Sequence, residues 1–191
     1  MFWTVFFIMQ SLKGKILVAT PDLLSDHIFS QAVIYIIEHI DAGAMGFIIN
    51  KPLNLNLRDN VKNTTTKYLV WDGGPVHKEN IFFLHNRPDL PIVNDIIDRD
   101  LNICLGSNRP EDFKLIFSNI INPENIKFFL GYSGWDSEQL DREIKEKAWF
   151  VYPNLINIFD ANTKNLWKKL IVEINPKNII WKNAPQDPSL N

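Results

Sequence analysis

The stretch AVIYIIEH, residues 32–39, is followed after a short connection by MGFIIN, residues 45–50. Both runs are rich in β-branched and aromatic side chains, which favour strands. The connection contains Asp41-Ala-Gly43, and a short glycine-containing link between two such runs is typical of a β-hairpin. This hairpin is the strongest local prediction in the sequence, and the other elements are placed around it.

Further strands are predicted on both sides of the hairpin. Lys15–Ala19 is an apolar run that stops at Thr20-Pro21, as a buried strand would. Pro52 is expected to end the second strand of the hairpin. Other apolar runs predict strands at 68–71, 81–85, 103–105, 126–130 and 149–152. Turns are predicted at 72–76 and at 131–135, where glycines gather.

Helices are predicted where apolar residues follow a helical period. Leu55, Leu57 and Val61 share one face, which indicates a short helix and a loop within 54–66. Asn108 is a candidate cap for a helix that Pro123 closes. Acid-to-base pairs four residues apart favour a surface helix over 136–147, and Asn162 is expected to open a last helix that ends at residue 171.

The order of these elements predicts an α+β fold with a mixed sheet, because hairpins coexist with helical crossovers. The 191 residues, 46% hydrophobic and 22% charged, suit a single domain. We divide the chain into an apolar N-terminal tail (1–12), the domain (13–182) and an extended C-terminal tail (183–191). The first nine residues are interpreted either as a segment packed on the domain or as codons upstream of a start at Met9, and we favour the second.

Composition excludes several classes of protein. Twenty basic residues against 22 acidic ones give a net charge of −2, which argues against a phosphate backbone as the main partner. The single cysteine, Cys104, allows no internal disulfide and favours a reducing compartment. No apolar run is long enough to span a membrane, and the first residues lack the basic region of a signal peptide. We therefore expect a cytoplasmic protein that does not act at a membrane.

No catalytic constellation is recognisable in the sequence. Gly131-Tyr-Ser-Gly-Trp135 resembles a nucleophile elbow, but Trp135 stands where the second glycine is needed and no histidine follows Ser133. Gly73-Gly74-Pro75 lacks the lysine and the third glycine of a phosphate-binding loop. The four histidines show no metal-ligand spacing. We predict no catalytic residue, no metal site and no cofactor, and we lean against an enzyme.

One group of residues remains as a candidate cleft, since sites often gather at strand ends and in glycine turns. Its members all occupy such positions: Asn50, Gly73, Gly74, His85, Gly131, Ser133 and Trp135. The competing interpretation, which we favour, is that glycines cluster in turns for backbone reasons.

These features also follow one another in a recognisable series. It comprises Gly14-Lys-Ile-Leu-Val-Ala-Thr-Pro21, Asp26, Phe29, Val33-Ile34, His39, Gly43, Gly46, Asn50-Lys-Pro52, Gly73-Gly-Pro-Val76, Leu84-His85, Gly131-Tyr-Ser-Gly-Trp135, Gln139-Leu140, Trp149 and the closing Pro188-Ser-Leu-Asn191. From residue 13 onward the chain resembles the YqgE/AlgH family of bacterial proteins. The chain departs from the family pattern at Ala32, where a serine or threonine is common, and at Asp136-Ser137, where a smaller pair is common.

The resemblance implies a single α+β domain with a bifurcated, partly barrel-like sheet flanked by helices, in a cytoplasmic bacterial protein. It supplies no established catalytic or binding residues, and some members carry the label of transcriptional regulator. We therefore expect a regulator that acts through protein partners rather than by binding nucleic acid directly. The alternative is a small-ligand-binding protein or an enzyme, with an unidentified ligand in a cleft at the glycine-rich strand ends.

Overall fold

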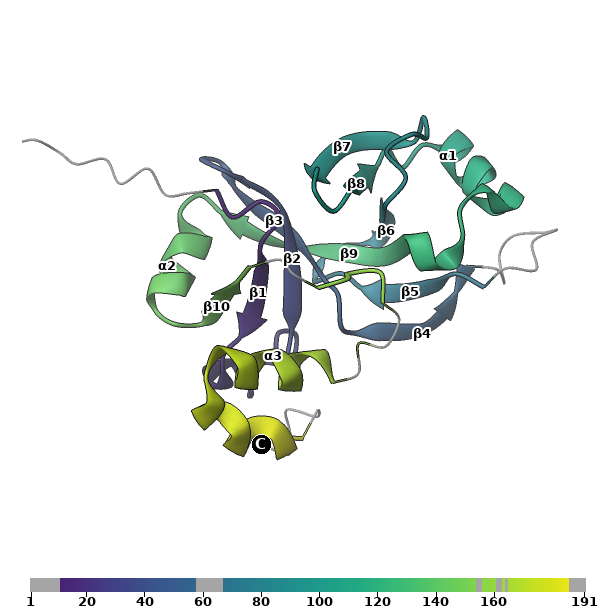
Figure 1. Cartoon of the computed structure of the whole chain (residues 1–191). Coiled ribbons are helices and arrows are strands. Elements are labelled where there is room, and N and C mark those ends of the chain that lie inside the picture. Colours follow the sequence, from purple (N-terminus) through teal and green to yellow (C-terminus); the bar gives the residue numbers. More distant parts are fainter. Residues whose placement is uncertain (1–10, 58–66, 154–155, 161–162, 164, 186–191) are drawn as a thin grey trace, which may run out of the picture.

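The hairpin predicted from residues 32–50 lies at the centre of one curled sheet (Figure 1). The structure is a computed structural model that describes residues 11–57, 67–153, 156–160, 163 and 165–185. Within these residues, strands run in the order β10-β1-β2-β3-β9-β6-β8-β7, and β4 and β5 attach beside β9. The curled mixed sheet with flanking helices confirms the expected α+β fold.

The first half of the sheet consists of antiparallel neighbours. β2 (Val33–Ile40) and β3 (Gly43–Ile48) form the predicted hairpin, in which Ile40 pairs with Gly43 across the turn. β1 (Ile16–Ala19) pairs with β2 on one edge and with β10 (Trp149–Tyr152) on the other. The burial of every residue of β1 explains its continuous apolar sequence.

The long strand β9 (Ile126–Asp136) joins the two halves of the sheet. β3 and β6 (Val76–His85) pair antiparallel with it on opposite edges, and β5 (Leu69–Asp72) runs parallel to its first part. The turn predicted at 131–135 is therefore wrong. The chain bends at Gly131 but continues as a strand, because partners on both edges complete its hydrogen bonds.

Two further strands differ from the sequence predictions. β4 (Pro52–Asn56) pairs with β5, so the predicted helix in this stretch is wrong for the described residues up to 57, and the prediction for 58–66 lies outside them. Pro52 begins this strand rather than ending β3, a position where its missing N–H is tolerated. β7 (Val93–Asp98) was not predicted because its apolar residues do not alternate with its polar ones, and it forms by pairing with β8 (Ile103–Gly106).

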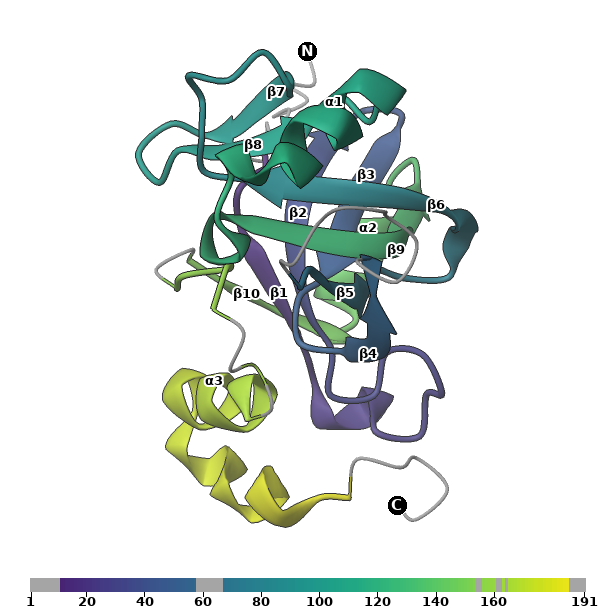
Figure 2. The same cartoon turned by 90° about the vertical axis from the view of Figure 1, so that its right-hand side faces the viewer.

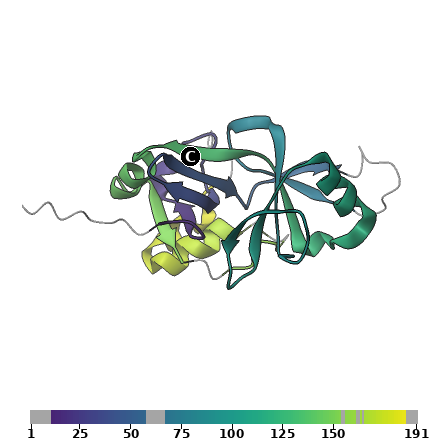
Figure 3. The same ribbon diagram turned by 90° about the horizontal axis from the view of Figure 1, so that it is seen from above.

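Helices cover the two ends of the sheet (Figure 3). At one end, α1 (Pro110–Leu115) begins after Arg109 rather than Asn108 and continues into the π-helical turn η3 (Ile116–Ile120), with the short 3₁₀ turn η4 (Pro123–Asn125) before β9. At the other end lies α2 (Gln139–Lys145), within the predicted 136–147.

The last two helical elements pack together beneath β1 and β2 (Figure 2). α3 (Leu166–Ile174) follows Asn165 rather than Asn162, which lies outside the described residues. The 3₁₀ helix η5 (Pro176–Asn183), which the sequence did not predict, turns back along α3. The indole N–H of Trp167 donates to the Ala19 carbonyl at 2.7 Å and ties α3 to β1. A single 3₁₀ turn, η1 (Pro21–Leu23), follows β1.

The core divides into two apolar clusters on either side of β9. The larger cluster joins β1, β2 and β3 to α3, and the smaller one lies under α1 around Tyr68, Phe83 and Phe128. No helix in the described part of the chain is long and apolar enough to cross a membrane. Most of the predicted N-terminal tail (1–12) and most of the predicted C-terminal tail (183–191) lie outside the described residues.

Candidate functional site

The glycine-rich residues of the predicted cleft meet where the loop between β5 and β6 crosses β9. The Gly73 N–H donates to the Leu130 carbonyl at 2.9 Å, and its carbonyl accepts from the Ser133 hydroxyl at 3.2 Å. A Cβ on Gly73 would lie 2.2 Å from the Gly131 carbonyl oxygen. The two backbones are therefore in direct contact, and Ser133 is fully buried.

The conformations of two of these glycines reinforce the close approach. Gly74 has φ +143° and Gly131 has φ +67°, values that side-chain-bearing residues rarely adopt. A Cβ on Gly74 would lie 2.3 Å from the Tyr132 carbonyl carbon. The close contact of the two backbones is sufficient to explain why glycines occupy this crossing. The Ser133 hydroxyl holds the loop in place through its hydrogen bond to the Gly73 carbonyl.

Asn50 lies beside this crossing but has its own partners. Its side-chain oxygen accepts from the Val33 N–H at 2.8 Å, and its side-chain nitrogen donates to the Gln31 carbonyl at 2.8 Å. The amide therefore joins the end of β3 to the start of β2. The oxygen and the nitrogen of the Asn50 amide both take part in this link, which fixes the edge of the hairpin.

Trp135 is the second-to-last residue of β9, and a side chain of α2 binds its indole. Its indole N–H donates to Oε2 of Glu143 at 2.9 Å, and the indole N–H of Trp149 donates to the same oxygen at 2.8 Å. Gln139 donates to the other carboxylate oxygen at 2.9 Å. Glu143 thus fixes two buried tryptophans, a role that the acid-base pattern of this helix did not suggest.

His85 lies at the opposite end of β9, where it pairs with Ile126. It is fully buried, and burial lowers its pKa to about 4. Its Nδ1 accepts from the Arg87 N–H at 3.2 Å, while Nε2 has no hydrogen-bond partner among the described residues. His85 is therefore a neutral core histidine at neutral pH.

The seven predicted residues do not converge on one point. Gly73, Gly74, Gly131 and Ser133 come together, and Asn50 precedes Lys51, whose carbonyl accepts from the Asp72 N–H at 2.9 Å. His85 and Trp135 lie near the two ends of β9. Ile126 and Trp135 are nine residue steps apart along the strand, a length of about 30 Å. The two pockets described below are lined by other residues, and ligand binding at the glycine crossing stays a prediction.

The first pocket, of about 510 Å³, opens between α3 and η5. Its lining mixes lysine side chains with aliphatic ones: Asn165, Lys168, Lys169, Val172, Glu173, Ile179, Lys182 and Asn183. Beside it, η5 exposes three consecutive apolar residues, with Ile179 58%, Ile180 71% and Trp181 36% exposed. The sequence carried this signal, since Ile-Ile-Trp interrupts a polar stretch, but no element was predicted between the last helix, ending at residue 171, and the tail that begins at residue 183. We call residues 165–183 the C-terminal face.

The second pocket, of about 380 Å³, lies between the start of β5, η4 and residues 157–160. Apolar side chains dominate its lining: Lys67, Tyr68, Leu69, Trp71, Pro123, Glu124, Ile126, Asn157, Phe159 and Asp160. Lys127 is not itself part of this lining, but its Nζ lies 4.1 Å from the centre of the Trp71 ring and 3.4 Å from the Asp160 carbonyl oxygen, and both residues belong to the lining.

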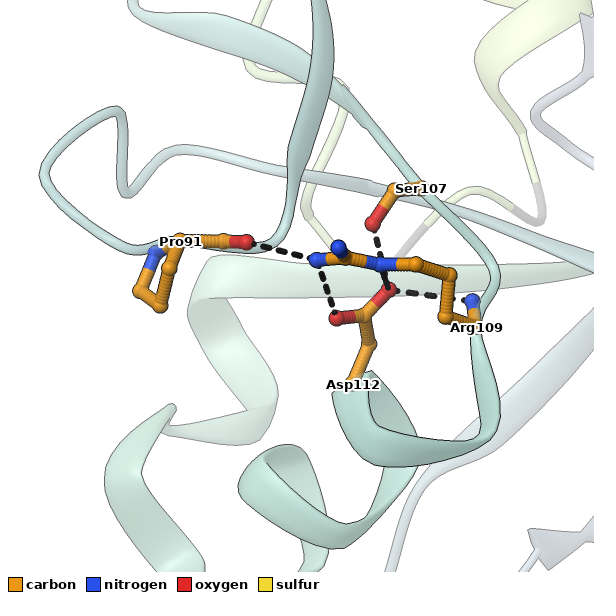
Figure 4. A network of polar contacts seen from close by, with 4 residues as sticks. All are labelled: Pro91, Ser107, Arg109 and Asp112. Atoms are coloured by element: carbon orange, nitrogen blue, oxygen red, sulfur yellow. Dashed lines mark hydrogen bonds and ion pairs between the residues drawn. The ribbon is translucent and has the colours of Figure 1, made fainter.

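The buried carboxylate of Asp112 is used in a structural network at the start of α1 (Figure 4). It accepts from the Arg109 backbone N–H at 3.0 Å, from the Arg109 guanidinium at 3.0 Å and from the Ser107 hydroxyl. The guanidinium also donates to the Pro91 carbonyl at 2.9 Å. Burial alone would raise the pKa of Asp112, but the hydrogen bonds from Arg109 and Ser107 outweigh it and hold the pKa below its usual value.

Within the described residues, no group of three or more histidine, cysteine, aspartate or glutamate side chains is placed to hold a metal ion. Cys104 is buried, and burial raises the pKa of its thiol, which disfavours the reactive thiolate. Two surfaces on which the described residues gather charge or enclose space are the C-terminal face and the pocket lined by Trp71 and Asp160, the two partners of Lys127.

The fold and these surfaces define the class: a single α+β domain with a curled, half-barrel sheet. A family model described as AlgH-like matches residues 16–178. The chain therefore belongs to the AlgH-like family, which confirms the resemblance found in the sequence.

Relatives and solved structures agree with this assignment. A UPF0301 protein of Bacteroides thetaiotaomicron is 35% identical over 184 residues, covering 94% of this chain and 91% of the relative. A UPF0301 protein of Bacteroides fragilis is 37% identical over 188 residues, with the same coverage of 94% and 91%. The solution structure of the AlgH protein from Pseudomonas aeruginosa superposes with a TM-score of 0.70 at 25% identity, covering 93% of this chain and 96% of that one. A crystal structure from Corynebacterium diphtheriae shares the fold, with a TM-score of 0.65 at 21% identity over 86% of this chain and 87% of that one.

Proposed function

We propose that this protein is a regulatory binding protein whose C-terminal face takes an acidic, partly apolar segment of another protein. The observation that carries the proposal is the exposed run Ile179-Ile180-Trp181 beside the pocket between α3 and η5. Large apolar side chains exposed side by side, with a polar rim, are typical of interaction surfaces.

Charge favours an acidic partner over a neutral one. The C-terminal face carries four lysines, Lys168, Lys169, Lys177 and Lys182, against one acid, Glu173, although the whole chain has a net charge of −2. Lys169 and Glu173 are 3.9 Å apart, a long ion pair between exposed groups that contributes little. The remaining lysines surround the apolar residues, so an acidic segment would gain charge complementarity at the rim.

A protein segment fits this face better than nucleic acid or a lipid surface. The pocket is concave and partly aliphatic, which suits an inserted side chain. Four lysines are few for a phosphate backbone, which binds through longer basic tracks. Regulation of transcription, if the protein serves it, would then act through a bound protein. We place this role in the cytoplasm, where a free thiol such as Cys104 stays reduced.

Affinity capture from a bacterial lysate with matched variants tests the proposal. Ile180→Asp removes an apolar residue that is 71% exposed, and the control Ile40→Asp makes the same change at the 56% exposed end of β2. We expect the wild type and Ile40→Asp to capture the same partner, and the captured amount to fall at least tenfold with Ile180→Asp. The captured amount should also fall as salt rises from about 0.1 M to about 0.5 M, because the Debye length shortens.

Two outcomes would contradict the proposal. A partner captured equally well by Ile180→Asp would place the interaction elsewhere on the molecule. Retention on vesicles of anionic phospholipid, with Ile180-dependent binding and no protein partner, would assign the face to a lipid surface.

The alternative of a small ligand at the glycine crossing has less support. The space that a side chain on Gly73, Gly74 or Gly131 would need is occupied by neighbouring backbone atoms. The Ser133 hydroxyl donates to the Gly73 carbonyl within the same crossing. A ligand there would have to displace these contacts, whereas the C-terminal face is already open.

A further inference from the structure

A lysine buried in the sheet is the most unusual polar group in the molecule. Lys127 belongs to β9, between Ile126 and Phe128, and its residue is fully buried. A buried ammonium group needs strong partners to offset its lost hydration. The described contacts of Nζ are a 3.4 Å hydrogen bond to the Asp160 carbonyl and the face of the Trp71 ring at 4.1 Å.

These weak contacts leave the amine poorly compensated. Burial lowers the pKa of Lys127 to about 7, and the nearby Asp160 opposes this only in part. At neutral pH far more of the Lys127 side chain is therefore the neutral amine than in an ordinary exposed lysine, for which fewer than about one molecule in a thousand is neutral. The neutral amine is the form that attacks carbonyl groups, and burial is a common way to produce it.

The pocket in front of Lys127 has the size and lining of a small-molecule site. Its volume is about 380 Å³, and both Trp71 and Asp160, the two partners of Nζ, belong to its wall. Small-ligand sites begin at about 300 Å³ and are mostly apolar. The Trp71 indole N–H is buried without a hydrogen-bond partner among the described residues, so a donor is available on the same ring that Nζ overlies.

The geometry points to a reactive-lysine site: Lys127 forms an imine with a small aldehyde of apolar body that enters the pocket between Trp71 and Phe159. The neutral Nζ attacks the carbonyl carbon to form the C–N bond, and the carbonyl oxygen takes up a proton to give a carbinolamine. Loss of that oxygen as water leaves the imine, so amine and aldehyde give imine and water. The Trp71 N–H supplies a hydrogen bond to the carbonyl oxygen.

The lining favours an uncharged aldehyde over an anionic one. Lys67 is the exposed cation of the lining, while Glu124 and Asp160 contribute two carboxylates. An additional negative charge would lie near both acids, whereas an aromatic or aliphatic body would contact Tyr68, Leu69 and Phe159. Benzaldehyde is therefore a suitable probe, and glyoxylate is its charged counterpart.

Reductive trapping of the folded protein tests the inference. Wild-type protein is incubated at pH 7 with benzaldehyde and cyanoborohydride, which adds hydride to the imine and leaves a stable secondary amine, and the modified lysines are mapped by mass spectrometry. We expect Lys127 to be modified at least about tenfold faster than the exposed Lys177, because far more of it is neutral. Glyoxylate should modify Lys127 more slowly than benzaldehyde does.

Two variants and a competitor connect the modification to the pocket. Lys127→Met keeps a similar apolar volume and should lose this adduct, while Asn157→Trp, at an exposed position of the lining, should slow it several-fold without touching Lys127. Asn183→Trp, in the pocket between α3 and η5, is the matched control and should leave the rate unchanged. Benzyl alcohol, which cannot form an imine, should protect Lys127 and not Lys177.

Other results would overturn the inference. Modification of Lys127 at the rate of Lys177, or only after unfolding in urea, would make Lys127 a closed core residue. Equal rates in the wild type and in Asn157→Trp would show that the amine is reached by another route.

Discussion

At the scale of single residues, this molecule uses its polar groups mainly to join backbone segments. Asn50 links two strand ends, Ser133 fixes the loop between β5 and β6, and Glu143 accepts from two indoles on different strands. Buried polar groups that are fully hydrogen-bonded specify one packing arrangement. These side chains therefore have structural roles in the fold, whereas the buried amine of Lys127 has only a long hydrogen bond and the face of an aromatic ring as partners.

The first prediction concerns the contact between Gly73 and Gly131. Gly73→Ala should lower the free energy of unfolding by about 3 kcal/mol or more, because the added Cβ would lie against backbone that cannot move aside. Gly134→Ala is the matched control, since its nearest neighbour is the end of the Tyr132 side chain at 3.1 Å, and it should cost less than about 1 kcal/mol. Urea denaturation of the three proteins measures the difference. Equal losses for the two variants would contradict the close crossing.

The second prediction concerns pH. The pKa of His85 falls from 6.5 to about 4 on folding, because burial disfavours the charged ring. The unfolded chain therefore binds more protons between these values, and the stability contributed by neutral His85 is complete above about pH 6.5 and lost as pH falls towards 4. The full effect amounts to about 3 kcal/mol.

Urea unfolding at pH 4.5, 5.5 and 7 checks this dependence. His85→Gln should flatten the decline in unfolding free energy below pH 6.5, while the exposed His27→Gln should leave it as in the wild type. Parallel profiles for the wild type and His85→Gln would show that His85 is not the group responsible.

At the scale of elements, sequence patterns predicted a strand or helix well where one face or the whole element is buried. The hairpin of β2 and β3, the buried β1 and the surface helix α2 each show a recognisable pattern of apolar or charged residues in the sequence. The sequence predicted that this strand stops before Gly131, because two glycines close together normally indicate a turn. Only the pairing of β9 with β3 and β6 shows that the strand continues.

The same reasoning explains the other differences. β4 and β7 each mix apolar with polar residues, and their partner strands β5 and β8 decide their conformation. Of the candidate cleft, the sequence supplied the seven residues and the interpretation that the glycines serve the backbone, but not the distances between the residues, since these depend on register along β9. Lys127 inside an apolar strand and Ile-Ile-Trp at 179–181 were visible signals of unusual positions, but their meaning depends on which pockets the fold places beside them.

The third prediction tests how α1 is held. Asp112→Ala removes the acceptor of Ser107 and Arg109 at the start of this helix, which should lower the free energy of unfolding by about 2 kcal/mol. Hydrogen exchange should accelerate at least tenfold over residues 111–117, while amides of β1 keep their protection. Glu111→Ala, an exposed acid in the same turn, is the control. Unchanged exchange in Asp112→Ala would mean that apolar packing alone holds the helix.

At the scale of the whole molecule, the two ends differ in what they offer a partner. α1 and η3 cover the small apolar cluster, and α3 covers the larger one, whereas η5 packs along α3 and exposes Ile179, Ile180 and Trp181 (Figures 1 and 2). The Gln31 side chain donates to the carbonyls of Ala184 and Pro185 at 3.3 and 2.6 Å, so the end of the described chain is fixed to the body of the domain. The exposed face is thus presented on a supported element, as a binding surface requires.

The central claim is that this face binds another protein, and site-specific photo-crosslinking in living bacteria tests it most directly. A benzophenone amino acid replaces Ile180 in one variant and Ile40 in the other, two exposed apolar positions on different parts of the domain. Our account predicts a discrete crosslinked product of reproducible mass from position 180 and none of that mass from position 40. The same product from both positions, or none from position 180, would contradict it.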